Sequence, residues 1–240
     1  MLHLQFEINS SIKTISSEFK VGIIHYQDIT ISDSPQMLKG RIRLFQESCH
    51  FDLLEKEVTS ITGINEWRKV FKQFGKDPNR YRPSVEALYR RLKKGQFLPP
   101  INSAVDLNNF FSLKYEIPFG IYDYYKLKGK VEFKIGTEND YYEGLNGNSI
   151  NLHNLIHSCD DEGPFGSPFV DSKRTPITRE TKNAVHVVYL KPSMECSEAN
   201  DMLESIGNMF QQVHGGTYSI NVIWLNWEGL KTFFFYFLIG

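Results

Sequence analysis

Helical and strand-like patterns follow one another along this sequence in an order that narrows the fold to one class. Apolar residues recur with a helical period between residues 34 and 115, and from residue 118 to residue 190 they form short runs separated by turns. A helical pattern from Ser197 and a strand pattern over residues 218–225 follow. The regular alternation of strands and helices that typifies a parallel sheet is absent. We therefore predict an α+β fold, with a mixed or antiparallel sheet and helices packed around it.

The clearest helix is expected between Ser84 and Gly95, because apolar residues recur there at i, i+3, i+4 and i+7. The glycines and asparagines of the chain suggest where other elements begin and end. A helix is expected to begin at residue 34 and to be broken at residues 63–65, and the next helix runs from a cap at Asn65 to Gly75. Further helices are expected over residues 101–115 and from residue 197. Strands are expected at 2–8, 21–24, 130–135, 152–156, 184–190 and 218–225, and a hairpin turn at Asn146-Gly147.

Residues 1–227 are expected to form a single domain. The apolar run over residues 233–239 breaks with the preceding pattern, so residues 228–240 are interpreted as a tail that is either a terminal strand or a frayed, non-native end. The run is too short to span a bilayer, and no signal peptide is visible. The three cysteines are widely spaced and form no C-x-x-C pair. We expect a cytoplasmic protein with no cofactor and no membrane partner.

The charge of the chain limits how it can contact nucleic acid. The formal net charge is −1 and the isoelectric point is about 6.7, so any contact with phosphates must be local. One dense basic cluster lies in and before the helix expected after Ser84. It can bind phosphates, or it can be a solvated face whose cations match the helix dipole. Its members are Arg80, Arg82, Arg90, Arg91, Lys93 and Lys94.

Two pairs of polar residues are candidates for a site. Asp106 and Asn109 are three positions apart and share a face of the helix expected over 101–115, where they can bind a ligand or satisfy buried loop backbone. His153 and His157 are four apart, but their surroundings resemble a strand and a turn rather than a helix. We therefore predict no metal site.

The segment from Gly163 to Asn183 begins with glycines, which allow unusual backbone conformations, and continues with a dense group of polar and charged side chains. Its first four residues, Gly-Pro-Phe-Gly, are expected to form a loop that lets another molecule approach the main chain. Residues 171–175 bring together an acceptor, two hydroxyls and two cations, and a helical turn capped by Thr178 is expected to follow. The segment is either a functional loop or a well-hydrogen-bonded surface loop.

Several stretches match a known family in their order and spacing. They are Arg82-Pro83-Ser84 with Leu88 and Arg91, Leu98-Pro99 with Asn102, Val105-Asp106 with Asn109, Tyr122-Asp123, Leu127 with Gly129, and the run Asp171-Ser172-Lys173-Arg174-Thr175 followed by Thr178, Thr181 and Asn183. Together they resemble the B3/B4 domain of the phenylalanyl-tRNA synthetase beta chain, in its free-standing form. The similarity covers residues 67–190.

The resemblance implies a tRNA-editing fold whose cleft hydrolyses the aminoacyl ester at the 3′ end of a misacylated tRNA. An ester is already activated, so oriented polar groups and a positioned water suffice. By resemblance, the basic cluster binds RNA. The catalytic residues implied are Asn109, Arg174, Thr175 and Glu180, and the substrate-binding residues are Asp106, Gly120, Gly166, Ser172 and Thr178.

Two positions depart from the family pattern. Gly120 stands where synthetase members carry a histidine, and Arg179 stands where they carry a glutamate that reads a tyrosine hydroxyl. Tyrosine specificity is therefore not expected. The resemblance leaves three hypotheses: a trans-acting aminoacyl-tRNA deacylase, a non-catalytic RNA- or tRNA-binding module, and a binder of free amino acids. A complete aminoacyl-tRNA ligase is not expected, because the sequence has no ATP-binding signature.

Overall fold

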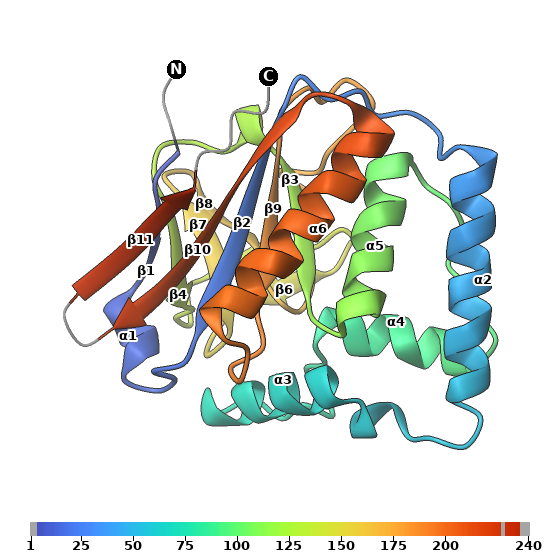
Figure 1. Ribbon diagram of the computed structural model, residues 1–240. Helices are drawn as coiled ribbons and strands as arrows, with labels where there is room; N and C mark the ends of the chain where they lie inside the picture. The colour runs from blue at the N-terminus through green and yellow to red at the C-terminus, as the bar shows by residue number, and fades with distance from the viewer. Residues whose placement is uncertain (1–3, 227–228, 236–240) are drawn as a thin grey trace.

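The computed structural model describes residues 4–226 and 229–235 of the chain (Figure 1). Its largest sheet has five strands in the order β11-β10-β2-β9-β3, and every neighbouring pair is antiparallel. The strands are Lys20–Gln27 (β2), Phe119–Asp123 (β3), Ala184–Tyr189 (β9), Thr217–Asn226 (β10) and Gly229–Phe235 (β11).

A second sheet has four strands in the order β1-β4-β7-β8, in which β1 and β4 are parallel and the other pairs are antiparallel. A separate two-stranded hairpin is formed by β5 and β6. The strands are Phe6–Ile8 (β1), Val131–Ile135 (β4), Tyr141–Glu143 (β5), Ser149–Asn151 (β6), Ile156–Asp160 (β7) and Gly163–Gly166 (β8).

The helices lie mainly on one side of the five-stranded sheet. In Figure 1, α6 crosses in front of the central strands, α5 lies beside it and α2 is outermost, while α3 and α4 lie below. The helices are Ser10–Lys13 (α1), Gln36–Asp52 (α2), Thr62–Gln73 (α3), Ser84–Lys93 (α4), Ser103–Tyr115 (α5) and Cys196–His214 (α6). The predicted α+β class is confirmed, and so is the mixture of parallel and antiparallel pairing.

Strand β9 shows how the core is divided. Its successive side chains point to opposite faces of the sheet. The ring of His186 packs against Phe111 of α5 and Phe210 of α6, whereas Tyr189 contacts Phe133 of β4 and Ser158 of β7. All six residues of β9 are buried, so the strand separates a helical layer from a second sheet layer.

Most helix and strand predictions match the structure within a few residues, and three do not. A strand is expected over residues 152–156, but the observed strand, β7, begins only at Ile156. The reason is that Asn154 adopts a left-handed backbone conformation (φ 57°), which interrupts extended structure. The loop expected over 163–166 is strand β8, which pairs with β7. The break expected at Gly63 lies inside α3, where a larger side chain would clash with the backbone of Glu116.

The turn expected at Thr178 is present as a single turn, closed by a hydrogen bond from the Thr181 amide to the Thr178 carbonyl (3.2 Å). The Thr178 hydroxyl accepts a hydrogen bond from the Glu180 amide (3.3 Å), and the Thr181 hydroxyl accepts one from the Thr178 amide (3.0 Å). Side-chain bonds of this kind compete with helical hydrogen bonds, and the backbone forms an isolated turn.

The end of the chain falls only partly within the described residues. Residues 229–235 form β11, which pairs with β10, so a terminal strand is present over this range. The remainder of the apolar run, residues 236–239, lies outside the described residues. A single domain over residues 1–227 stays a prediction.

Candidate functional site

A cleft of about 430 Å³ opens between α5, the first half of α4 and the edge strand β3. The segment that follows β8 closes its remaining side. This cavity, the α5 cleft, is lined by Ser84, Leu88, Ile101, Asn102, Val105, Asn108, Asn109, Ser112, Phe119, Ile121, Tyr122, Leu145, Asp171, Ser172, Pro176 and Ile177. It combines apolar walls with a few convergent polar groups, as small-molecule sites do.

Helix α5 brings two neighbouring amides to this cleft. The helix begins where it does because the Asn102 side chain accepts hydrogen bonds from the backbone amides of Ala104 (3.1 Å) and Val105 (3.0 Å). Further along, the buried Oδ1 atom of Asn108 has no hydrogen-bond partner among the described residues. The side chain of Asn109 likewise has no partner among them. A buried acceptor left unpaired costs stability, so these amides offer hydrogen bonds that a ligand can complete.

Opposite α5, the buried Tyr122 is paired with the half-buried Asp171. The Tyr122 hydroxyl donates a 2.6 Å hydrogen bond to Asp171 Oδ1, and the ring packs edge-on against Phe165 with 4.8 Å between centroids. The hydroxyl lies over Gly120 and Gly166, and a Cβ atom at either glycine would clash with it. Tyr122 therefore fills the space into which a side chain at position 120, such as the family's histidine, would project.

Burial controls the protonation of this pair. Desolvation raises the pKa of Asp171 to about 7, against the lowering effect of hydrogen bonds from Tyr122 and the Ser167 amide. Burial, together with the nearby Asp171, raises the pKa of Tyr122 well above its usual value. The pair therefore titrates through its carboxyl group near neutral pH, while the phenol keeps its proton.

Four of the predicted site residues are in or next to this cleft. Asn109 and Ser172 line it, and Gly120 and Gly166 lie beneath the Tyr122 hydroxyl. These four residues come from α5, from the segment after β8 and from strands of two different sheets. Their proximity is produced by the fold rather than by their spacing in the sequence.

Arg174 is not brought to the α5 cleft. Its guanidinium is held by the carboxylates of Asp160 (2.7 Å) and Glu162 (3.1 Å) and by the carbonyl of Gly163 (3.1 Å). These contacts anchor the segment after β8 to the turn between β7 and β8. These contacts give Arg174 a structural position outside the cleft, and the catalytic role that the resemblance implied stays a prediction.

The other predicted residues are also outside the cleft lining. Asp106 is buried, and its oxygens accept hydrogen bonds from the Ser34 hydroxyl (2.6 Å) and the Ile101 amide (2.8 Å), which is the loop-satisfying alternative. Thr175 is fully buried, and its hydroxyl has no partner among the described residues. Thr178 and Glu180 are exposed in their turn, where the Thr178 hydrogen bond lowers the pKa of Glu180.

No site role is predicted from the sequence for Tyr122, Asp171 or Asn108, which line the cleft. Tyr122 and Asp171 belong to the stretches that carry the family resemblance, so a signal for them was present. Asn108 had none, because a single polar residue in a predicted helix is ordinarily interpreted as solvent-exposed.

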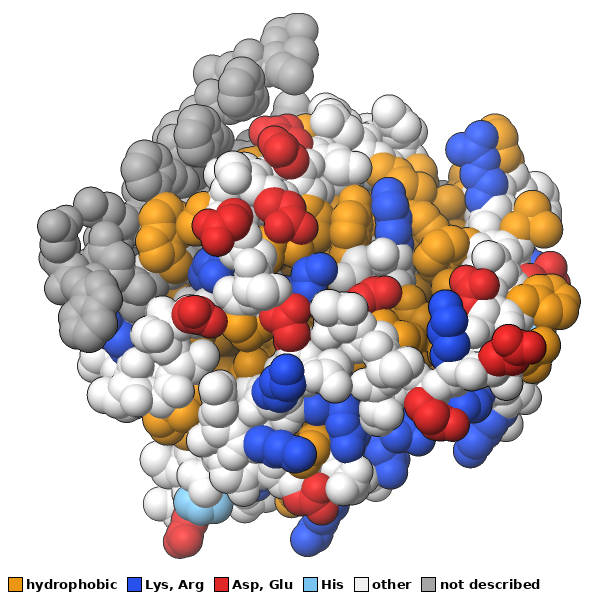
Figure 2. Space-filling model, turned by 60° about the horizontal axis from the view of Figure 1, so that its bottom comes forward, with side chains coloured by type: hydrophobic (Ala, Val, Ile, Leu, Met, Phe, Trp, Pro, Cys, Tyr) orange, Lys and Arg blue, Asp and Glu red, His pale blue; other side chains and the backbone are white. Residues whose placement is uncertain are grey.

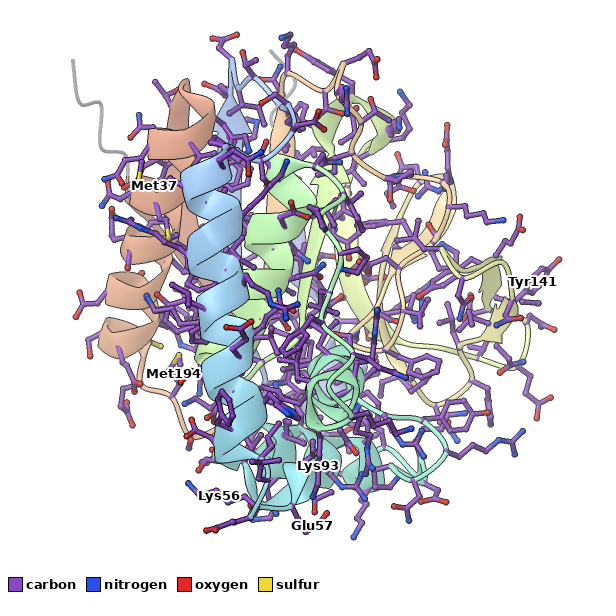
Figure 3. All side chains as sticks on the ribbon, turned by 90° about the vertical axis from the view of Figure 1, so that its right-hand side faces the viewer. Met37, Lys56, Glu57, Lys93, Tyr141 and Met194 are labelled. Carbon is purple, nitrogen blue, oxygen red and sulfur yellow. The ribbon has the colours of Figure 1, made fainter. Side chains whose placement is uncertain are left out.

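The basic cluster lies beside the cleft and is partly neutralised. Arg90 binds Glu86 (2.8 Å), and Lys93 binds Glu57 (3.0 Å) at the end of α4 (Figure 3). Four members form no ion pair with any described residue: Arg80, Arg82, Arg91 and Lys94. Figure 2 shows Lys and Arg side chains gathered on the face of the molecule that α3 and α4 present.

Arg91 belongs to the helix that lines the cleft. Ser84 and Leu88 line the α5 cleft, and Arg91 follows Ser84 by seven residues and Leu88 by three, towards the end of α4. RNA binding by the cluster stays a prediction.

Two further cavities lie within the described residues. One of about 270 Å³, between α2, residues 97–100 and α5, is lined by both Asp106 and Asn109, and it shares Asn109 with the α5 cleft. The other, of about 600 Å³, is lined by residues that include His25 and Lys128 and by none of the predicted site residues. No group of three or more His, Cys, Asp or Glu side chains within the described residues is placed to hold a metal ion. No described helix is both long and apolar enough to cross a bilayer.

Comparisons with known proteins place these observations in a family. A family model described as the B3/4 domain matches residues 66–201. The uncharacterised protein YhzB of Bacillus subtilis is 32% identical over 222 residues, which cover 92% of this chain and 100% of YhzB. The phenylalanine–tRNA ligase beta subunit of Bartonella henselae is 29% identical over 92 residues, which cover 37% of this chain and 11% of that subunit.

Solved structures are also similar to this chain. Among them is an N-terminal fragment of the phenylalanyl-tRNA synthetase beta subunit from Pyrococcus horikoshii, with a TM-score of 0.48 and 14% sequence identity. The similarity covers 96% of this chain and 54% of the fragment. This chain therefore spans the full length of the Bacillus relative but only a part of the two synthetase subunits.

Proposed function

This chain belongs to the B3/4 domain family, and from that membership we propose that it hydrolyses the aminoacyl ester of a misacylated tRNA in trans. The α5 cleft is the reaction site in this proposal. The observation that carries it is the pair of unpartnered amides, Asn108 and Asn109, which face a tyrosine–aspartate pair across a partly apolar cavity. A relative of the chain is a tRNA ligase subunit, which supplies the substrate class.

The walls of the cleft suit an aminoacyl group. Leu88, Val105 and Ile121 provide an apolar surface for the amino acid side chain. The buried Asn108 Oδ1 is an acceptor for an ammonium or hydroxyl group of the substrate. Both features hold a small amphipathic ligand in one orientation, which is most of what an activated ester needs for hydrolysis.

Asn109 has the chemistry to stabilise the transition state. Water attack on an ester carbonyl develops negative charge on the carbonyl oxygen. The Asn109 side-chain NH₂ group is a donor with no competing partner among the described residues, and it can bind that oxyanion. The nucleic acid portion would leave the cleft past Arg91, whose charge favours the adjacent phosphates.

The test is deacylation of a panel of mischarged tRNAs by the purified protein, compared with buffer. We expect one or a few aminoacyl species to be lost faster. Asn109→Ala should lower kcat/KM about 10²-fold, as loss of a single oxyanion donor does. Asn208→Ala, an exposed asparagine of α6, is the matched control and should leave the rate unchanged.

Either of two results would contradict the proposal. Hydrolysis of no species in the panel, with tRNA still bound at low salt, would favour a non-catalytic RNA-binding module. A rise in melting temperature with a free amino acid, without any tRNA binding, would favour an amino-acid binder.

A further inference from the structure

We propose that Asp171 is the general base of this hydrolysis and that Tyr122 is the residue that positions it. The inference rests on the proposed function, and it names the group that takes the proton from the attacking water. The family resemblance implied no catalytic or substrate-binding role for Asp171.

The geometry leaves one carboxylate oxygen of Asp171 available. Oδ1 accepts hydrogen bonds from the Tyr122 hydroxyl (2.6 Å) and the Ser167 amide (3.4 Å). Oδ2 has no hydrogen-bond partner among the described residues, and Asp171 lines the α5 cleft. One oxygen is therefore held by the protein, and the other is free to bind a water molecule in the cavity.

The position of Tyr122 is fixed on all sides. The residue is 1% exposed, its ring packs on Phe165, and its hydroxyl sits over Gly120 and Gly166, where any side chain would displace it. The same hydroxyl therefore explains why both positions, 120 and 166, are glycines. They make room for a hydroxyl that orients the Asp171 carboxylate, in the space that the family's histidine would need.

The proposed step needs water as its only co-reactant. The Asp171 carboxylate takes a proton from water as the water oxygen bonds to the ester carbonyl carbon. The tetrahedral intermediate then collapses, the bond between the carbonyl carbon and the ribose oxygen breaks, and that oxygen receives the proton from Asp171. The products are a free amino acid and a tRNA with its terminal hydroxyl restored, and the carboxylate is regenerated.

The surroundings of Asp171 support this role at neutral pH. The titratable groups that face it are tyrosines: Tyr122 from β3, Tyr142 from β5 and Tyr189 from β9, each with a pKa raised mainly by burial. The residues of helices α4 and α5 that line the same cavity are all uncharged. The Asp171 pKa of about 7 gives a base that is half ionised at neutral pH and still strong enough to accept a proton.

The experiment measures deacylation of the tRNA species identified by the panel, as kcat/KM between pH 5.5 and 8.5 with the buffer rate subtracted. Asp171→Asn keeps the shape and the Oδ1 acceptor, and we expect a loss of at least about 10²-fold at pH 7.5. Asp201→Asn, on the exposed surface of α6, is the matched control and should not change the rate. Binding of the uncharged tRNA should be the same for all three proteins.

Tyr122→Phe separates positioning from simple support of the fold. The Tyr122 hydrogen bond lowers the pKa of Asp171, so its loss should move the acidic limb of the pH profile to higher pH. A purely structural role would lower the rate equally at every pH. A melting temperature within a few degrees of the wild type for each variant shows that the fold is retained.

The outcomes are distinguishable. Wild-type hydrolysis that Asn109→Ala removes and Asp171→Asn leaves intact would overturn the role of Asp171 while the proposed function stands. Absence of hydrolysis by the wild-type protein across the whole panel would overturn both. An unshifted acidic limb in Tyr122→Phe would overturn the role of Tyr122 alone.

Discussion

Arg174 and Asp160 form an ion pair whose carboxylate is shielded from solvent. The two atoms are 2.7 Å apart, and the side chains are 27% and 0% exposed, respectively. Removing one partner of a buried pair leaves the other charge without compensation. We expect Arg174→Ala to lower the free energy of unfolding by about 2–3 kcal/mol, less than for a fully buried pair because the arginine is partly solvated. Urea denaturation measures this change.

A matched variant tests that reasoning. Arg179 pairs with Asp33 at 2.6 Å, but both side chains are mostly exposed, so Arg179→Ala should cost about 0.5 kcal/mol or less. An Arg174→Ala protein that is as stable as the wild type yet inactive in deacylation would instead support the catalytic role that the resemblance implied.

Asp106 holds two elements together at the start of α5. It binds the Ile101 amide in the connector before α5 and the Ser34 hydroxyl just before α2. We expect Asp106→Ala to lower the free energy of unfolding by about 2 kcal/mol, because buried donors lose their acceptor. The same variant should keep its deacylation rate per folded molecule.

Asn109→Ala is expected to have the opposite effect to Asp106→Ala. The two residues share a helix, but Asn109 makes no hydrogen bond to any described residue and should lose rate without losing stability. A stable Asp106→Ala protein that fails to bind substrate would show that the carboxylate contacts the ligand. Chemical denaturation and deacylation of the two variants, measured in parallel, decide between these cases.

The local sequence pattern predicted individual helices and turns well where a single periodicity or a clear turn motif dominated the segment. Helix α4 was predicted from its apolar face and from Gly95, and the hairpin between β5 and β6 from Asn146-Gly147. Strand β8 was not, because a Gly-Pro-Phe-Gly stretch has no alternation, and it becomes a strand only by pairing with β7. Elements made by tertiary pairing leave little trace in a short segment.

The site was less predictable than the elements, and the reason lies in the whole fold. The α5 cleft is assembled from α4, α5, β3 and the segment after β8, which are brought together by antiparallel pairing of β3 with β9. Spacing along the chain identified Asn109, but it could not show that Arg174 reaches Asp160 instead of the cavity. The direction in which a side chain points is settled only when the sheet is complete.

The charge of the whole molecule gives the last prediction. The net charge is only −1, so tRNA binding must depend on where the cations lie rather than on their number. Arg91→Glu, in the last turn of α4, should weaken tRNA binding about 10-fold and reduce the slope of log K against log salt concentration by about one. Arg41→Glu changes the net charge equally, but it lies in the first half of α2, away from α4 (Figure 1), and should have little effect. Equal weakening by both variants, measured by filter binding at several salt concentrations, would mean that binding follows net charge, and the local surface beside the cleft would then not be the tRNA contact.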